Sequence, residues 1–275
     1  MAANSRHWFN GVKYLTYFLL SANVFVFLQE EMLALQYTFT DGIGPGDIIQ
    51  AFSATIDTTA WVILLLLFEL ETSVIPDSAI RGRVKWALHG IRGICGVFIV
   101  YALYGYISEL MALYRVELLP VSDACALLGA DWSLLVDIDE YEPLTAANCA
   151  GLGAEFWRVS GFQIVADTAH LQAAQMLAWT DVINASAWIL VVLVLEVDVR
   201  LQLRGTYTDQ LLRINTVIKV LVYSLLFLAA VFWWFKGDFI DFWDAFLWLF
   251  AFVFIEMNVF DWQAETRAEQ QTAAA

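Results

Sequence analysis

Two acidic residues, Glu69 and Glu196, lie inside long apolar stretches, where an unpaired carboxylate is costly. The two stretches correspond to each other at a separation of 127 positions: residues 57–72 read DTTAWVILLLLFELET and residues 184–199 read NASAWILVVLVLEVDV. In the same register, a base follows each acid, because Arg92 falls on Lys219. The sequence therefore predicts that an acid and a base are placed twice in one membrane.

These acids and bases are candidates for ion pairs. Helices joined by a short loop pack antiparallel, which brings Glu69 to the depth of Arg92 and Glu196 to the depth of Lys219. One interpretation is a charge network that binds or relays an ion or a proton. The other is a structural clasp, with the bases extending to the membrane interface. Glu256, which follows a long Phe-rich and Trp-rich run, also needs a partner or a proton.

A second set of polar residues also matches across the two stretches. Asp57 corresponds to Asn184, and Glu71 corresponds to Asp198. At 100° per residue, Asp57 and Glu71 lie within about 40° of the same helix face. A polar stripe along the helix is consistent with a wet path or with helix packing through Ser and Thr, and the sequence leaves both interpretations open.

The elements that carry these residues are predicted to be membrane helices. The chain is 60% hydrophobic and only 16% charged, which does not fit a soluble globular domain. A spanning helix needs roughly 20 mainly apolar residues. Six segments meet this requirement: 12–28, 48–70, 86–110, 177–197, 214–235 and 239–260. The predicted fold is therefore an all-α polytopic membrane protein.

The basic residues predict the orientation. Lys and Arg of short loops favour the cytoplasmic side, and they gather between spans two and three and between spans four and five. Both termini are then cytoplasmic, and a cell (inner) membrane is the expected location. In this topology spans 2–3 and 4–5 form a parallel internal duplication about an axis along the membrane normal. We expect four regions: 1–112 with three spans, 113–176 as a cap, 177–262 with three spans, and a disordered tail at 263–275.

The predicted extracytoplasmic cap is acidic. It holds much of the net charge of −15, and because no basic stripe is present, nucleic-acid binding is not expected. Cys125 and Cys149 both lie in the cap, and an oxidising compartment would join them in a disulfide. Residues 155–177 carry apolar side chains at helical spacing and predict an amphipathic helix that leads into span four.

No phosphate-binding glycine loop, GxSxG, HExxH or metal-ligand spacing occurs in the sequence. We therefore predict neither catalytic residues nor a metal or cofactor. Two functional hypotheses remain. The first is an ion or proton channel or coupled transporter that uses the buried carboxylates with Arg92 and Lys219. The second is a non-catalytic membrane scaffold or assembly subunit that binds a partner through its acidic cap. The expected partners are the lipid bilayer and, under either hypothesis, a second copy of the chain or a membrane partner subunit.

Overall fold

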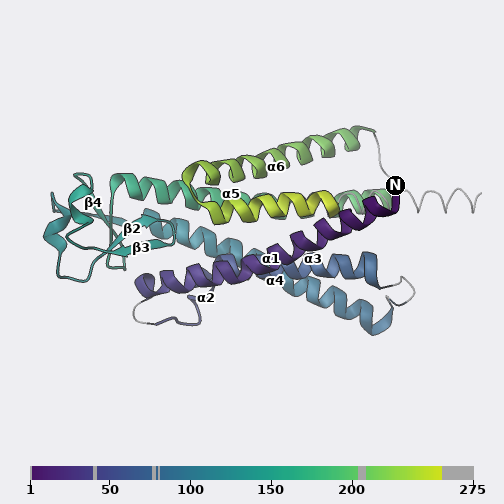
Figure 1. Cartoon of the computed structure of the whole chain (residues 1–275), viewed down its shortest axis with the longest axis horizontal. Coiled ribbons are helices and arrows are strands. Elements are labelled where there is room, and N and C mark those ends of the chain that lie inside the picture. Colours follow the sequence, from purple (N-terminus) through teal and green to yellow (C-terminus); the bar gives the residue numbers. More distant parts are fainter. Residues whose placement is uncertain (1, 40–41, 76–78, 80, 204–208, 256–275) are drawn as a thin grey trace, which may run out of the picture. The chain divides into compact units, whose positions relative to one another are not determined.

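The computed structural model describes residues 2–39, 42–75, 79, 81–203 and 209–255. Its main helices are α1 (Ala2–Thr38), α3 (Ser53–Glu69), α4 (Gly82–Tyr114), α5 (Thr168–Leu203) and α6 (Asp209–Lys236) (Figure 1). Within the described residues, five helical segments are long and apolar enough to cross a membrane: Trp8–Thr38, Ser53–Thr72, Gly82–Tyr114, Thr168–Val197 and Arg213–Lys236. A further helix covers 239–255, and the rest of the predicted sixth span lies outside the described residues. These helices indicate a membrane protein, while the sixth span and the duplication stay predictions.

The chain divides into two compact units, each considered by itself. Unit 1 comprises Met1–Val24, Thr58–Cys95 and Val220–Ala275, and unit 2 comprises Phe25–Asp57 and Gly96–Lys219. Both units expose large apolar side chains on their helices, such as Phe18 and Val97, which are 68% and 69% exposed. In lipid such surfaces need no covering, because lipid tails are as apolar as the side chains.

Helix α1 has one buried face along most of its length. Its buried residues recur every three or four positions, as one face of a helix requires. The series contains ionisable and polar side chains among apolar ones: Lys13, Thr16, Tyr17, Leu20, Asn23, Phe27, Glu31 and Ala34. Helix α1 ends ten residues beyond residue 28, the predicted end of span one, so Glu31 lies within the helix.

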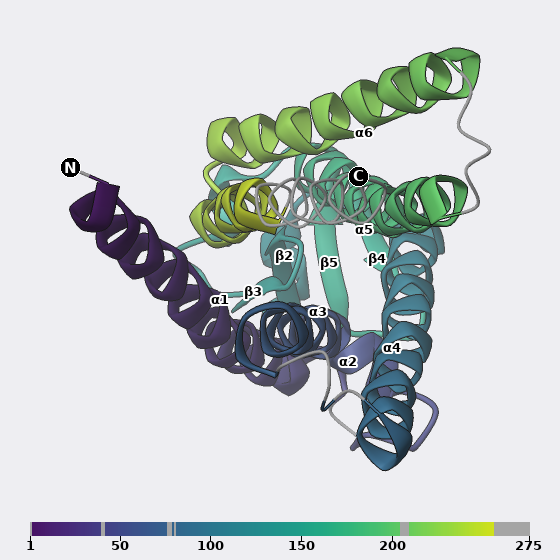
Figure 2. The ribbon, with the colours of Figure 1, turned by 90° about the vertical axis from the view of Figure 1, so that its right-hand side faces the viewer.

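The cap contains a five-stranded sheet. Its strands are β1 (Val116–Leu119), β2 (Ser133–Asp137), β3 (Glu140–Pro143), β4 (Phe156–Val159) and β5 (Ile164–Asp167), in the order β1-β4-β5-β2-β3. The β2 and β5 strands are parallel, and the other pairs are antiparallel. Figure 2 shows β5 between β4 and β2. The sheet lies where α4 ends and α5 begins, so it closes one end of unit 2.

The sheet corrects the all-α prediction and the helix predicted at 155–177. Residues 156–159 and 164–167 are strands, and α5 begins only at Thr168. Gly161, at φ +91°, makes the turn between β4 and β5, a conformation that interrupts a helix. All four residues of β5 are buried, and the first three, Ile164 to Ala166, give a continuous apolar run without the alternation of a half-exposed strand. Such a run is easily mistaken for a buried helical segment.

The predicted disulfide between Cys125 and Cys149 is confirmed. It joins two short 3₁₀ turns, η3 (Ala124–Leu127) and η4 (Cys149–Gly151), across 24 positions. Cys149 packs with Ala124, Phe156 and Val165 in a small core on the sheet. The bond therefore ties the connection between β1 and β2 to the connection between β3 and β4.

Close packing at Gly105 gives a first prediction. A Cβ atom at this position of α4 would lie 2.7 Å from the carbonyl oxygen of Ile49, in α2 (Ile48–Ala51), and 2.9 Å from Cβ of Ser53. Neither contact can relax by moving a flexible side-chain end, so Gly105→Ala should lower the free energy of unfolding by about 1–3 kcal/mol. Gly96→Ala is the matched control, since no atom lies within 4 Å of its Cβ. Denaturation in detergent should show this control to be neutral or slightly more stable than the wild type.

Candidate functional site

Unit 1 contains a buried ion pair between Lys13 of α1 and Glu69, the last residue of α3. The Lys13 ammonium donates to Glu69 Oε1 at 2.7 Å, and the two side chains are only 5% and 7% exposed. Both residues lie within candidate membrane spans. Ionisable groups at such positions usually mark ion pathways or proton relays, because their burial is costly.

Two tyrosines of α1 complete the surroundings of Glu69. The Tyr14 hydroxyl donates to the same oxygen, Oε1, at 3.0 Å, and the Lys13 ammonium lies 5.0 Å from the centre of the Tyr14 ring. The Tyr17 hydroxyl lies close to Glu69 and interacts with it electrostatically, but among the described residues it has no partner in hydrogen-bond geometry. Glu69 Oε2 is likewise buried and without a hydrogen-bond partner among these residues. One carboxylate oxygen thus accepts two bonds and the other accepts none, which makes the site asymmetric.

The predicted pairing of Glu69 with Arg92 is corrected by the structure. Arg92 instead donates to Glu71 at 2.6 Å, and this second pair is more exposed, at 46% and 20%. Immediately after Glu69 the chain winds into a π-helical turn, η1 (Leu70–Val74). Residues two positions apart in a helix do not share a face, so Glu71 can pair with Arg92 while Glu69 pairs with Lys13. Single π-helical turns of this kind often occur at functional sites.

The residues of the second repeat have a different setting. Glu196 is exposed and Lys219 is partly buried, and each makes an interaction in the structure. Their predicted pairing therefore stays a prediction. The side chain of Asp198 and all of Glu256 lie outside the described residues.

The predicted polar stripe is partly buried. Asp57 and Asn184 are both half-buried within unit 2. Asn184 Oδ1 is inaccessible to solvent and has no hydrogen-bond partner, whereas Asp57 makes an interaction of its own. Elsewhere, in unit 1, the buried Asn23 side chain donates to Asp244 Oδ1 at 2.8 Å, which links α1 to the helix at 239–255. Such polar contacts are typical of helix packing in membranes.

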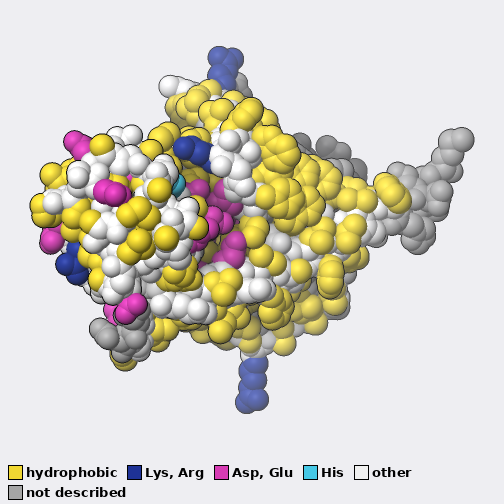
Figure 3. Space-filling view, turned by 60° about the vertical axis from the view of Figure 1, so that its left-hand side comes forward, with side chains coloured by type: hydrophobic (Ala, Val, Ile, Leu, Met, Phe, Trp, Pro, Cys, Tyr) yellow, Lys and Arg dark blue, Asp and Glu magenta, His cyan; other side chains and the backbone are white. Residues whose placement is uncertain are grey.

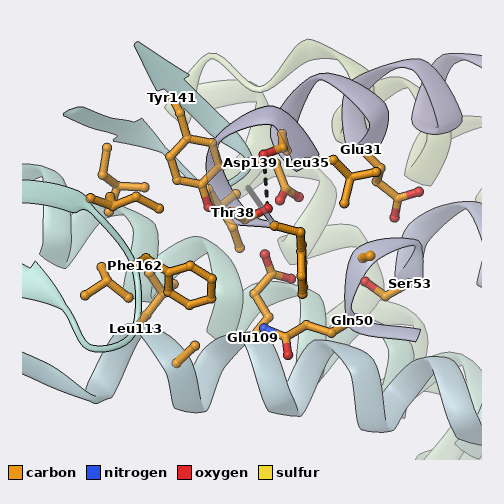
Figure 4. Close-up of a pocket in the computed structure, with 18 residues that line it drawn as sticks. Glu31, Leu35, Thr38, Gln50, Ser53, Glu109, Leu113, Asp139, Tyr141 and Phe162 are labelled. Atoms are coloured by element: carbon orange, nitrogen blue, oxygen red, sulfur yellow. Dashed lines mark hydrogen bonds between the residues drawn. The ribbon is translucent and has the colours of Figure 1, made fainter. Parts of the chain in front are cut away.

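Unit 2 contains an acidic cavity under the cap, with a volume of about 50 Å³. Its lining includes Glu31 of α1 and Glu109 of α4, with Asp139 and Tyr141 from the β2–β3 hairpin (Figure 4). Asp139, Asp181 and Glu31 all act electrostatically on Glu109, so four acids share this region. Figure 3 shows acidic side chains gathered in a hollow beside the cap. Burial, with added repulsion from Asp139 and Glu109, raises the pKa of the Tyr141 hydroxyl.

Glu31 also has a structural role in this region. Its carboxylate accepts hydrogen bonds from the Ala54 amide at 2.8 Å and from the Thr55 amide and hydroxyl. These amides belong to the first turn of α3, where backbone N–H groups have no acceptor within the helix. A carboxylate is favourable at a helix N-terminus, so Glu31 caps α3 from the neighbouring helix.

Lys13, Tyr17, Glu31 and Glu109 are absent from the residues predicted to matter. Lys13 lies at the edge of the predicted first span and resembles an ordinary flanking charge, and Glu31 and Glu109 lie at or beyond predicted span ends. One signal was available for α1. The series of residues 13, 17, 20, 23, 27, 31 and 34 keeps helical spacing without interruption, which places Lys13 and Glu31 on the same face as Leu20.

The chain was also compared with known proteins. No protein-family model, no curated protein and no solved structure matches it.

Proposed function

We propose that this protein moves a proton or a small cation across a membrane, as a channel or a coupled transporter, with the Lys13–Glu69 pair as its central element. The observation that supports the proposal most is that this pair is buried within candidate membrane spans. In addition, one carboxylate oxygen, Glu69 Oε2, has no hydrogen-bond partner among the described residues. Six spans, both termini in the cytoplasm and a cell (inner) membrane location belong to the same proposal.

The energetics favour this function over a purely structural clasp. Burying two charges costs several kcal/mol per ion, and apolar residues of similar volume often hold helices equally well. A structural clasp is more stable when every polar atom is hydrogen-bonded, because a buried acceptor without a hydrogen bond costs about 1–3 kcal/mol. Glu69 Oε2 and the Tyr17 hydroxyl both remain unmet within the described part of the chain. A site that exchanges a proton or an ion accounts for both features.

The acidic cavity of unit 2 fits the same function. A cleft lined by charges of one sign raises the local concentration of counter-ions. The volume of about 50 Å³ holds about three to five waters at about 10–15 Å³ each. Pockets for organic ligands are about 300–1,000 Å³. The cavity is therefore suited to collecting small cations or protons and too small for an organic substrate.

A flux experiment tests the proposal. Purified protein in liposomes should conduct protons or a small cation, and Glu69→Gln should reduce this flux by at least tenfold, on the order of the effect of losing one positioned proton-transfer group. Glu155→Gln provides the matched control, because it removes an exposed carboxylate of the cap. Ion and proton fluxes are measured with internal dyes at clamped membrane potential. Equal flux in the wild type and Glu69→Gln, or none in either, would contradict the proposal.

A second candidate, a non-catalytic scaffold, is favoured by the cap itself. The sheet packs Phe156 and Val165 with Ala124 and Cys149 in an apolar core made of cap residues, and the disulfide lies beside this core. An acidic cap closed by a disulfide is suited to presenting a surface to a partner. A complete absence of flux in the experiment above would favour this candidate.

A further inference from the structure

We infer that Glu69 and Tyr17 hold a water molecule between them and that the ion moved by the protein is a proton, carried by Glu69. This inference rests on the proposed function and names the ion for the same site. Two polar atoms at this site, Glu69 Oε2 and the Tyr17 hydroxyl, lack hydrogen-bond partners among the described residues. Both belong to residues that are about 95% buried, at 5% and 4% exposure.

A water molecule satisfies both atoms at once. A buried water typically makes about three hydrogen bonds to groups that would otherwise lack partners. It donates to Glu69 Oε2, which can only accept, and it accepts from the Tyr17 hydroxyl, which is a donor. Tyr14 cannot take this place, because its hydroxyl already donates to Oε1 at 3.0 Å. The asymmetry of the carboxylate thus has a chemical reason: one oxygen faces the ammonium and the other faces the water.

The donor set does not suit a metal ion. Ca²⁺ takes six to eight oxygen ligands and Mg²⁺ requires six in octahedral geometry. Among the described residues at this site, Glu69 Oε2 and the Tyr17 hydroxyl lack partners, and the Lys13 ammonium lies 2.7 Å from the other carboxylate oxygen. Across the described residues, no group of three or more His, Cys, Asp or Glu side chains could hold a metal ion. A proton needs a single acceptor, and Oε2 supplies it.

Glu69 binds one proton and then releases it. In the resting site Glu69 is a carboxylate and Lys13 an ammonium, so the pair is neutral. A hydronium ion arriving through the water gives one proton to Oε2, which forms an O–H bond and leaves a neutral carboxylic acid beside a single positive charge. Lys13 then lacks a counter-charge. Loss of the proton to the opposite side restores the carboxylate and the pair. Tyr17 positions the water throughout and keeps its own proton.

The Tyr17→Phe variant tests this inference, since it removes one oxygen atom and little else. We expect wild-type liposomes to take up protons, Glu69→Gln to lose this flux, and Tyr17→Phe to slow it by about tenfold. Tyr104→Phe is the control, because that side chain is 60% exposed on α4. Sodium, potassium and calcium fluxes are measured in the same vesicles and should be absent.

The outcomes separate this inference from the proposed function. Metal-cation flux that depends on Glu69 without proton flux leaves the proposed function standing and overturns the proton assignment. Proton flux that is equal in Tyr17→Phe and the wild type overturns the role of the bound water. Absence of any flux overturns both. Infrared difference spectra give a second readout that does not depend on transport. A protonated-carboxyl C=O band that is absent from Glu69→Gln should appear on acidification, and it should shift in Tyr17→Phe.

Discussion

Lys13→Met should lower the free energy of unfolding by about 3–5 kcal/mol, because it leaves the Glu69 carboxylate buried without its counter-charge. The expected loss is large since both side chains of the pair are more than 90% buried. The measurement is chemical denaturation in detergent micelles or bicelles, followed by tryptophan fluorescence. Because the mutant retains a buried acid, its stability should also recover when Glu69 is made neutral.

A double-mutant cycle supplies the control for this prediction. Lys13→Met combined with Glu69→Gln should recover much of the lost stability, because no unpaired charge then remains. Arg92→Met provides a comparison within the same unit. Arg92 is 46% exposed, so breaking its pair with Glu71 should cost only about 0–1 kcal/mol. Equal losses of unfolding free energy for Lys13→Met and Arg92→Met would show that burial does not determine how much these ion pairs contribute to stability.

The position of Glu69 could be predicted from the sequence, whereas its partner could not. An acid deep in an apolar run must have a partner, and that inference needs only the local sequence. The identity of the partner depends on how helices far apart in the chain are rotated, and Lys13 is 56 positions away. Depth alone favoured Arg92, but that base pairs with Glu71, which lies at nearly the same depth as Glu69 and on another face of the helix.

Similar limits apply to the cap and to its acidic cavity. The cysteine spacing in an acidic loop was sufficient to predict the disulfide. The strands were missed because a buried strand and a buried helical segment have the same apolar composition, and only the turn at Gly161 separates them. Glu31 and Glu109 were missed because each lies near a helix end, where a charged residue is ordinary. Their importance arises only when α1, α4 and the β2–β3 hairpin are brought together.

Loss of the disulfide should destabilise the cap by about 3 kcal/mol, the amount expected from loop-closure entropy for a separation of 24 positions. The Cys125→Ser/Cys149→Ser variant should therefore show faster amide hydrogen exchange in β4 and β5, whose Phe156 and Val165 pack against this cross-link. Exchange in α4 should change little, since its hydrogen bonds lie within the helix. Cys95→Ala is the control, because Cys95 is a free cysteine outside the cap.

The same bond reports on the side of the membrane that the cap faces, because structural disulfides persist in oxidising compartments and are rare in the cytosol. Protein unfolded from freshly prepared membranes should react with one maleimide, at Cys95, and with three after reduction. Reaction with three before reduction would place the cap on the reducing side, and the orientation derived from the basic loops would have to be reversed. Reaction with one would show that the cap matures in an oxidising space.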